Sequence, residues 1–194
     1  FKLIKKHTKE DGSLFSKNDL IQAYRALAGT HGLQPYNQKL VHRLQMKPTR
    51  TISGVAPVTV LTKPFPCPGK CIFCPNDVRM PKSYLSDEPG AQRAERNFFD
   101  PYLQTFNRLQ ALHNIGHQVS KAEIIVLGGT WSFYTEQYQI WFIKECFRAL
   151  NDFSEVVLGV KNVADADDTK RKDDRDTIIK LYEQMNARYK EAQQ

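Results

Sequence analysis

Apolar residues recur at helical spacing in the first fifty positions and predict a small helical region. Ser16 and Asp19 form a capping-box pattern at the start of one helix, and Gly29 is suited to end it. The apolar face of that helix carries Leu20, Ile21, Tyr24, Leu27 and Ala28. A second helix is expected over about 37–46, and Pro48 should end it because proline cannot supply the N–H that a continuing helix needs.

Two runs of aliphatic residues predict strands. One covers 55–63 (VAPVTVLTK), and the other covers 122–127 (AEIIVL) and is compact enough for burial on both faces of a parallel sheet. A helix is expected over about 91–114, broken near Asp100, and another over 135–151. The predicted apolar side of this last helix consists of Ile140, Ile143, Phe147 and Leu150. The order strand, helix, strand, helix is that of a βαβ unit, so the expected fold class is α/β.

The pattern weakens towards the end of the chain. Residues 155–160 fit a short strand or a packed loop, and residues 161–176 hold 11 charged side chains out of 16, which is typical of a solvated insertion. A last amphipathic helix is expected over about 174–192.

Composition resembles that of an ordinary soluble domain. Of 194 residues, 41% are hydrophobic and 25% are charged, which excludes wholesale disorder and collagen-like fibres. No run of about 18 apolar residues occurs, and the first residues lack the apolar stretch of a signal peptide. We therefore expect a cytoplasmic protein without a membrane segment.

The basic excess is unevenly distributed. The chain carries a net charge of +7, but residues 1–100 alone hold 16 basic and 8 acidic side chains. A basic half joined to a nearly neutral half is typical of a surface that binds a polyanion. Ordinary solubility charge is the alternative.

Three of the four cysteines lie close together, at Cys67, Cys71 and Cys74, in the spacing C-x3-C-x2-C. Soft thiolates at this spacing favour an iron–sulfur cluster, and three ligands leave one iron of a cubane free for a substrate or cofactor. Zinc is one alternative and spectator thiols are another. A structural zinc site would need a fourth ligand, and His113 and His117 lie about 40 residues further on.

Two further features bear on this chemistry. Gly128, Gly129 and Thr130 directly follow the second predicted strand, at the end where α/β folds place their ligands. The glycines allow a close backbone approach. Cys146 lies on the helix over 135–151 and is expected to act as a small buried side chain.

The cysteine spacing after one strand and the glycine turn after the next resemble the radical S-adenosylmethionine (SAM) enzymes. The resemblance implies that Cys67, Cys71 and Cys74 bind a [4Fe-4S] cluster and act catalytically. It implies that Phe73, Gly128, Gly129 and Thr130 contact the cofactor. Thr130 departs from the glutamate that is usual at its position.

A narrower resemblance is to the catalytic subunit family of Elongator, in the prokaryotic form of the cysteine spacing. It is carried by RTISGVAPVTVLTKPFPCPGKCIFCPN (50–76), SYLSDEPGAQRA (83–94) and FDPYLQTFNRLQALHNIGHQVSKAEIIVLGGT (99–130). In that family threonine is the expected residue after the two glycines. The implied fold is part of a radical SAM partial (βα)6 barrel over 50–194, preceded by a helical tRNA-binding region over 1–49. Because the family's chain continues into further barrel strands and an acetyltransferase-like domain, these 194 residues are expected to be its N-terminal part.

The resemblance implies a wobble-uridine-modifying enzyme of the acyltransferase class. SAM would yield a radical that takes hydrogen from the methyl group of acetyl-CoA, and the carbon radical would add to carbon 5 of the uridine. Lys121 aligns with a lysine that handles acetyl-CoA; its alternative role is a surface lysine before a buried strand. Implied partners are the tRNA anticodon loop and either a second copy of the chain or Elongator-type subunits. The cations that could grip RNA phosphates are Lys47, Arg50, Lys63, Lys70, Arg79, Lys82, Arg93 and Arg96.

Two other functions fit parts of the same pattern. One is a metal-stabilised RNA-binding module without catalysis. The other is a radical SAM enzyme with a different substrate, against which the family-like stretch over 83–130 argues. Tyr84 and Glu88 lie in that stretch without an assigned role.

Overall fold

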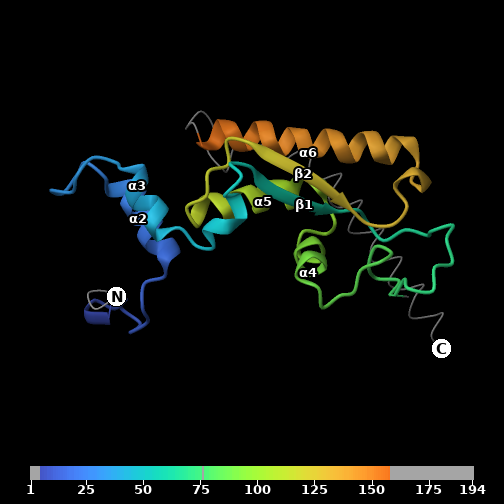
Figure 1. The fold of residues 1–194 in the computed structure, drawn as a ribbon, viewed down its shortest axis with the longest axis horizontal. Helices are drawn as coiled ribbons and strands as arrows, with labels where there is room; N and C mark the ends of the chain where they lie inside the picture. Colours follow the sequence, from blue (N-terminus) through green and yellow to red (C-terminus); the bar gives the residue numbers. More distant parts are fainter. Residues whose placement is uncertain (1–4, 76, 158–194) are drawn as a thin grey trace. The chain divides into compact units, whose positions relative to one another are not determined.

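The computed structural model describes residues 5–75 and 77–157. Its helices and strands, in chain order, are α2 (Lys17–Leu27), α3 (Gln38–Leu44), η1 (Pro48–Thr51), β1 (Ala56–Leu61), α4 (Pro89–Arg96), α5 (Pro101–Asn114), β2 (Ala122–Leu127), η2 (Trp131–Phe133) and α6 (Glu136–Val157) (Figure 1). The predicted features over 158–160, 161–176 and 174–192 lie outside the described residues.

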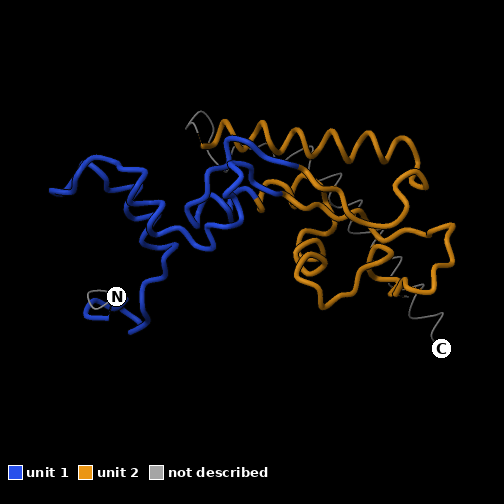
Figure 2. Tube along the Cα trace, viewed as in Figure 1, with its two compact units in different colours: residues 1–57, 109–123 blue, residues 58–108, 124–194 orange. Residues whose placement is uncertain are grey.

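The chain divides into two compact units, one of residues 1–57 and 109–123 and the other of residues 58–108 and 124–194 (Figure 2). The predicted domain boundary at residue 50 stays a prediction.

The first unit contains the predicted N-terminal helices. Ser16 caps α2 with the reciprocal capping box to Asp19, as the sequence predicted. Helix α3 ends at Leu44, and Pro48 begins the short η1 turn, so proline does not terminate this helix directly. The first unit's core includes Ile21 and Val41, which are fully buried.

Strands β1 and β2 form a two-stranded parallel sheet. The Ala56 N–H donates to the Lys121 carbonyl, and the Thr62 N–H donates to the Leu127 carbonyl six residues further along both strands. The prediction that β2 is buried on both faces is wrong for the described residues: five of its six side chains are half-buried and Glu123 is exposed. The parallel strands, with the helices between them and after them, form a small α/β arrangement, as predicted.

The helices differ from the predictions at their ends. Helix α4 begins at Pro89, two residues before the predicted start, and the first turn suits a residue with no N–H to satisfy. The expected break falls at 97–100, where the Asp100 carboxylate accepts from the Leu103 N–H and caps α5.

Helix α6 continues to Val157, so residues 155–157 are helical and the predicted strand or loop is wrong there. Its predicted apolar side is also wrong, because Ile140 and Phe147 are exposed. The buried face instead consists of Phe142, Glu145, Cys146, Ala149 and Phe153.

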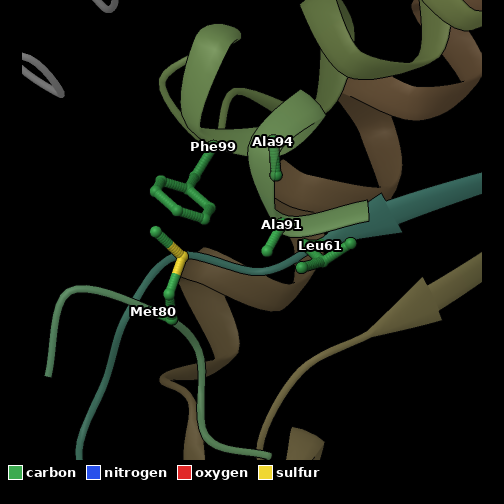
Figure 3. Close-up of a cluster of buried hydrophobic side chains, with 5 residues drawn as sticks. All are labelled: Leu61, Met80, Ala91, Ala94 and Phe99. Carbon is green, nitrogen blue, oxygen red and sulfur yellow. The ribbon is translucent and has the colours of Figure 1, made fainter. Parts of the chain in front are cut away.

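The core cluster of the second unit joins segments from both sides of the cysteines. Its buried members are Leu61, Met80, Ala91, Ala94 and Phe99 (Figure 3). Leu61 ends β1 and Met80 follows the cysteines, so both ends of the intervening loop are fixed in the same apolar cluster.

Candidate functional site

The three cysteines lie on the segment 62–79, called here the cysteine loop. All three are free thiols; Cys71 is exposed, and Cys67 and Cys74 are half-buried. A methyl group on Gly69 would lie 3.5 Å from Sγ of Cys71 and 3.7 Å from Sγ of Cys67. Both sulfurs therefore lie close to the Gly69 backbone.

The cysteine loop and the Gly128–Thr130 turn line the same cavity, which has a volume of about 590 Å³. Its lining consists of Cys67, Gly69, Lys70, Cys71, Phe73, Cys74, Lys82, Ser83, Gly128, Gly129 and Thr130. The motifs that the sequence paired thus surround one space at the carboxyl ends of two parallel strands, where α/β folds bind ligands.

The glycine turn approaches β1 too closely for any side chain. Gly128 has φ +150°, and a Cβ there would overlap the Thr62 hydroxyl and lie 3.1 Å from the Thr62 Cβ. A Cβ on Gly129 would meet the Lys82 Cβ at 3.4 Å. Both glycines therefore bring backbone close to neighbouring groups, as the sequence predicted.

Thr130 links the turn directly to a cysteine, because its Oγ1 lies 3.4 Å from Sγ of Cys67. This hydrogen bond is the main cause that lowers the pKa of Cys67, and the Gly69 backbone and the Lys82 charge act in the same direction. Cys146 contrasts with it: it is 1% exposed, and burial raises its pKa to about 11. The prediction of a buried Cys146 is confirmed.

Aromatic residues that were not among the predicted site residues pack against the start of the cysteine loop. The Phe65 ring stacks on Tyr134 at 4.9 Å, and Tyr134 stacks on Tyr138 at 5.0 Å. The ammonium group of Lys63 lies 4.7 Å from the centre of the Tyr138 ring. The one sequence signal was the aromatic run that follows the glycine turn, Trp131-Ser-Phe-Tyr134.

The arrangement of the donor side chains bears on which kind of metal group the cavity could hold. Within residues 5–75 and 77–157, no three His, Cys, Asp or Glu side chains converge closely enough to hold one metal ion. Zinc requires such convergence, whereas an iron–sulfur cluster takes each thiolate on a different iron and needs room between them. Three thiols line one open cavity, and this arrangement leaves room for a cluster.

The two histidines considered for zinc belong to the first unit. His117 is 1% exposed, and its Nδ1 lies 2.7 Å from both the Gln45 amide nitrogen and the Thr51 hydroxyl. Burial, reinforced by the Arg25 charge, lowers the pKa of His113 to about 4. The His117 ring is thus held by two polar partners within its own unit.

The predicted RNA-binding cations occupy different environments. Lys70 and Lys82 line the cavity, whereas Lys47, Arg50 and Arg96 are exposed elsewhere. Two arginines already have protein partners. Arg79 makes a bidentate pair with the Asp77 carboxylate, and Arg93 donates to the Thr59 hydroxyl.

Two predicted cofactor residues are placed differently from one another. Phe73 lines the cavity with its ring 92% exposed. Lys121 is exposed at the amino end of β2, whereas the cavity lies beyond its carboxyl end.

A second cavity of about 380 Å³ shares Gly128 and Gly129 with the first and also includes Tyr84. Val126 and Leu127 both line it, although successive strand residues point to opposite faces. Its lining also includes Thr62, so this cavity lies at the carboxyl ends of β1 and β2.

The fold and the site define a class: an α/β protein with a three-cysteine loop facing a glycine turn at the ends of two parallel strands. No family model matches the chain. It is 48% identical over 118 residues to the tRNA uridine(34) acetyltransferase of Methanocaldococcus jannaschii, which covers 58% of this chain and 22% of that protein. It is 47% identical over 105 residues to the protein of the same name from Dehalococcoides mccartyi (54% of this chain, 23% of that protein).

Elongator complex protein 3 of Homo sapiens is 39% identical over 127 residues, covering 60% of this chain and 23% of the human protein. Over the matched stretch the chain is similar to proteins of the Elongator catalytic subunit family. The matches span less than a quarter of the length of these relatives. None of the helices in the described part of the chain is long and apolar enough to cross a bilayer.

Proposed function

We propose that this chain is the N-terminal part of an enzyme that modifies the wobble uridine of tRNA with a [4Fe-4S] cluster, SAM and acetyl-CoA. The observation that carries the proposal is the single cavity between the cysteine loop and the Gly128–Thr130 turn. The relatives named for tRNA uridine(34) acetylation support the substrate.

In this proposal Cys67, Cys71 and Cys74 hold the cluster, and one iron has no protein ligand. The cluster would supply the electron that cleaves SAM reductively. The lowered pKa of Cys67 favours the thiolate that binds iron. The Thr130 hydroxyl and the Lys82 charge stabilise that thiolate from the opposite wall of the cavity.

The turn would bind SAM through its backbone. Gly128 and Gly129 carry no side chains, so a ligand can approach their peptide groups closely, and Phe73 offers an apolar ring to the same cavity. Lys70 and Lys82 are placed where a carboxylate or phosphate entering the cavity would meet them. Lys121 is proposed for acetyl-CoA, and the exposed cations Lys47, Arg50 and Arg96 for RNA phosphates.

The proposed fold is the beginning of a radical SAM partial barrel. Two parallel strands, each followed by a loop that contributes to the same cavity, support it. The metal-stabilised RNA-binding module is less well supported, because the described donors do not converge on a single ion.

Anaerobic reconstitution with iron and sulfide tests the cluster. The reduced protein should give the electron paramagnetic resonance signal of a cubane cluster, and adding SAM should shift it. Serine at Cys67, Cys71 or Cys74 should abolish the signal. Cys146→Ser is the matched control, since that thiol is buried on α6 away from the cavity lining. A metal-free or zinc-loaded wild-type protein would refute the cluster.

A second measurement tests the RNA substrate. Binding of a tRNA anticodon stem–loop should weaken steeply with salt, because phosphate contacts release counterions. Charge removal at Lys70 or Lys82 should reduce both the affinity and the salt slope. Arg79→Gln is the control, because that guanidinium is paired with Asp77. An affinity and a salt slope that neither substitution changes would refute RNA contact at the cavity.

A further inference from the structure

Near the start of the cysteine loop, both backbone polar groups of Lys63 are hydrogen-bonded to tyrosine hydroxyls. The Tyr134 hydroxyl donates to the Lys63 carbonyl oxygen at 3.0 Å. The Lys63 N–H donates to the Tyr138 hydroxyl, also at 3.0 Å. Lys63 is therefore fixed on both sides by the segment that follows the glycine turn.

Tyr134 also contacts Thr62, whose hydroxyl lies 2.8 Å from its own. A phenol has one proton, and the Tyr134 proton is directed to the Lys63 carbonyl, so Thr62 donates to the Tyr134 oxygen. Tyr134 is 5% exposed and Thr62 is 1% exposed, so water cannot easily replace these bonds. Thr62 is in addition the residue against which Gly128 packs.

The hydrogen bonds that join Tyr134 and Tyr138 to the Lys63 backbone are called here the clamp. A stiff arm, residues 63–67, connects this clamp to the first cysteine. The sequence from Lys63 to Cys67 is Lys-Pro-Phe-Pro-Cys, and each proline ring fixes φ. The Phe65 ring within the arm stacks on Tyr134. A displacement of Lys63 is therefore transmitted to Cys67 rather than absorbed between them.

We propose that Tyr134 is a positioning residue: its hydroxyl holds Lys63 and thereby sets where Cys67 lies relative to the Gly128–Thr130 turn. Tyr134 would thus determine whether Cys67 and Thr130 can share the 3.4 Å contact. The relevance to catalysis rests on the proposed function, whereas the geometric effect does not.

Two variants separate the hydroxyl from the packing of the ring. Tyr134→Phe keeps the stacking on Phe65 and Tyr138 and removes only the hydroxyl. Tyr102→Phe is the matched control, because Tyr102 is 3% exposed and its hydroxyl donates to the Asp152 carboxylate at 2.9 Å, between α5 and α6. Tyr134→Phe loses two buried phenol hydrogen bonds, to Lys63 and Thr62, and Tyr102→Phe loses one in the same unit.

Hydrogen exchange on the 194-residue chain without metal tests the geometry. Tyr134→Phe should speed exchange of the Lys63 and Cys74 amides, whose N–H groups donate to the Tyr138 hydroxyl and the Cys71 carbonyl, by about tenfold, as expected for the loss of a buried hydrogen bond. Tyr102→Phe should leave these amides unchanged and affect α5 and α6 instead. Equal effects of the two variants on the cysteine loop would overturn the proposal.

Titration of the reconstituted, reduced proteins with SAM tests the consequence. Tyr134→Phe should retain iron but need about tenfold more SAM to produce the spectral shift, whereas Tyr102→Phe should match wild type. A wild-type SAM response in Tyr134→Phe would make the tyrosine structural only and overturn the positioning role. A wild-type protein that loads no cluster would refute the proposed function, and the exchange measurement would still decide the geometry.

Discussion

The Cys67 sulfur lies 3.4 Å from the Thr130 hydroxyl, although 63 positions separate the two residues along the chain. The contact exists because parallel strands place their carboxyl ends at the same edge of a sheet. β1 leads into the cysteine loop and β2 leads into the glycine turn, so two segments that are distant in sequence form opposite walls of one cavity.

Thr130→Val should raise the pKa of Cys67. The hydroxyl stabilises the thiolate by donating to it, so its removal favours the neutral thiol and moves the onset of reactivity to higher pH. Alkylation of Cys67 in the metal-free protein, followed by peptide mass spectrometry, should slow about threefold or more at pH 7. Thr130→Ser keeps the hydroxyl and should react like wild type; equal rates in all three proteins would contradict the contact.

Gly128→Ala should destabilise the protein more than Gly54→Ala. Both glycines have positive φ, +150° and +78°, so alanine is strained at either position. Only at Gly128 would the new methyl group also overlap the Thr62 hydroxyl, whereas Gly54 has open space around it. Chemical denaturation should show an extra cost of about 1–3 kcal/mol at Gly128. Similar midpoints for the two variants would mean that the turn can move away from β1.

The site could be predicted largely from local patterns, because its chemistry depends on residue types at fixed spacing. The three cysteines and the Gly-Gly-Thr turn each required only a short stretch of sequence, and the strands before them were long enough to recognise. Their meeting at one cavity then followed from the parallel pairing.

The predictions that were wrong or missing concern features that depend on contacts between distant segments. Ile140 and Phe147 repeat at helical spacing, yet α6 buries Phe142 and Cys146 instead, since the face of a helix that packs inward is chosen by its neighbours. Tyr134 could not be assigned from sequence for the same reason. Its function depends on the Lys63 carbonyl, 71 positions away.

Gln104→Leu should destabilise the end of β1. The buried Gln104 amide accepts from the Leu61 N–H and donates to the Leu61 carbonyl, each at 2.9 Å, and so acts as a neighbouring strand would. Leucine leaves two buried backbone groups unpaired, at a cost of about 2 kcal/mol or more.

Denaturation of two further variants controls for this effect. Gln110→Leu, on the same helix, removes only a bond to Asn114 one turn away and should cost little. Gln104→Glu keeps the acceptor for the Leu61 N–H and should fall between wild type and Gln104→Leu. A Gln104→Leu protein as stable as Gln110→Leu would show that the backbone of β1 finds other partners.

His113 should make the first unit sensitive to acid. Burial is the main cause that lowers its pKa to about 4, and the Arg25 charge adds to it, so the native state resists a proton that the unfolded chain accepts near pH 6.5. A histidine whose pKa is lowered by folding does not change the free energy of unfolding above pH 6.5. It reduces that free energy as the pH falls from 6.5 towards 4.

The midpoint of urea unfolding at pH 7, 5.5 and 4.5 measures this loss, and His113→Gln separates it from the titration of carboxylates. Glutamine cannot take up the proton, so the variant should lose less stability than wild type over this range, by about 1–2 kcal/mol once solvent screening is allowed for. The two proteins should differ in slope only below pH 6.5. Parallel curves throughout would show that the His113 ring becomes protonated within the folded protein, and the apolar packing around it would then be looser than its partial burial requires.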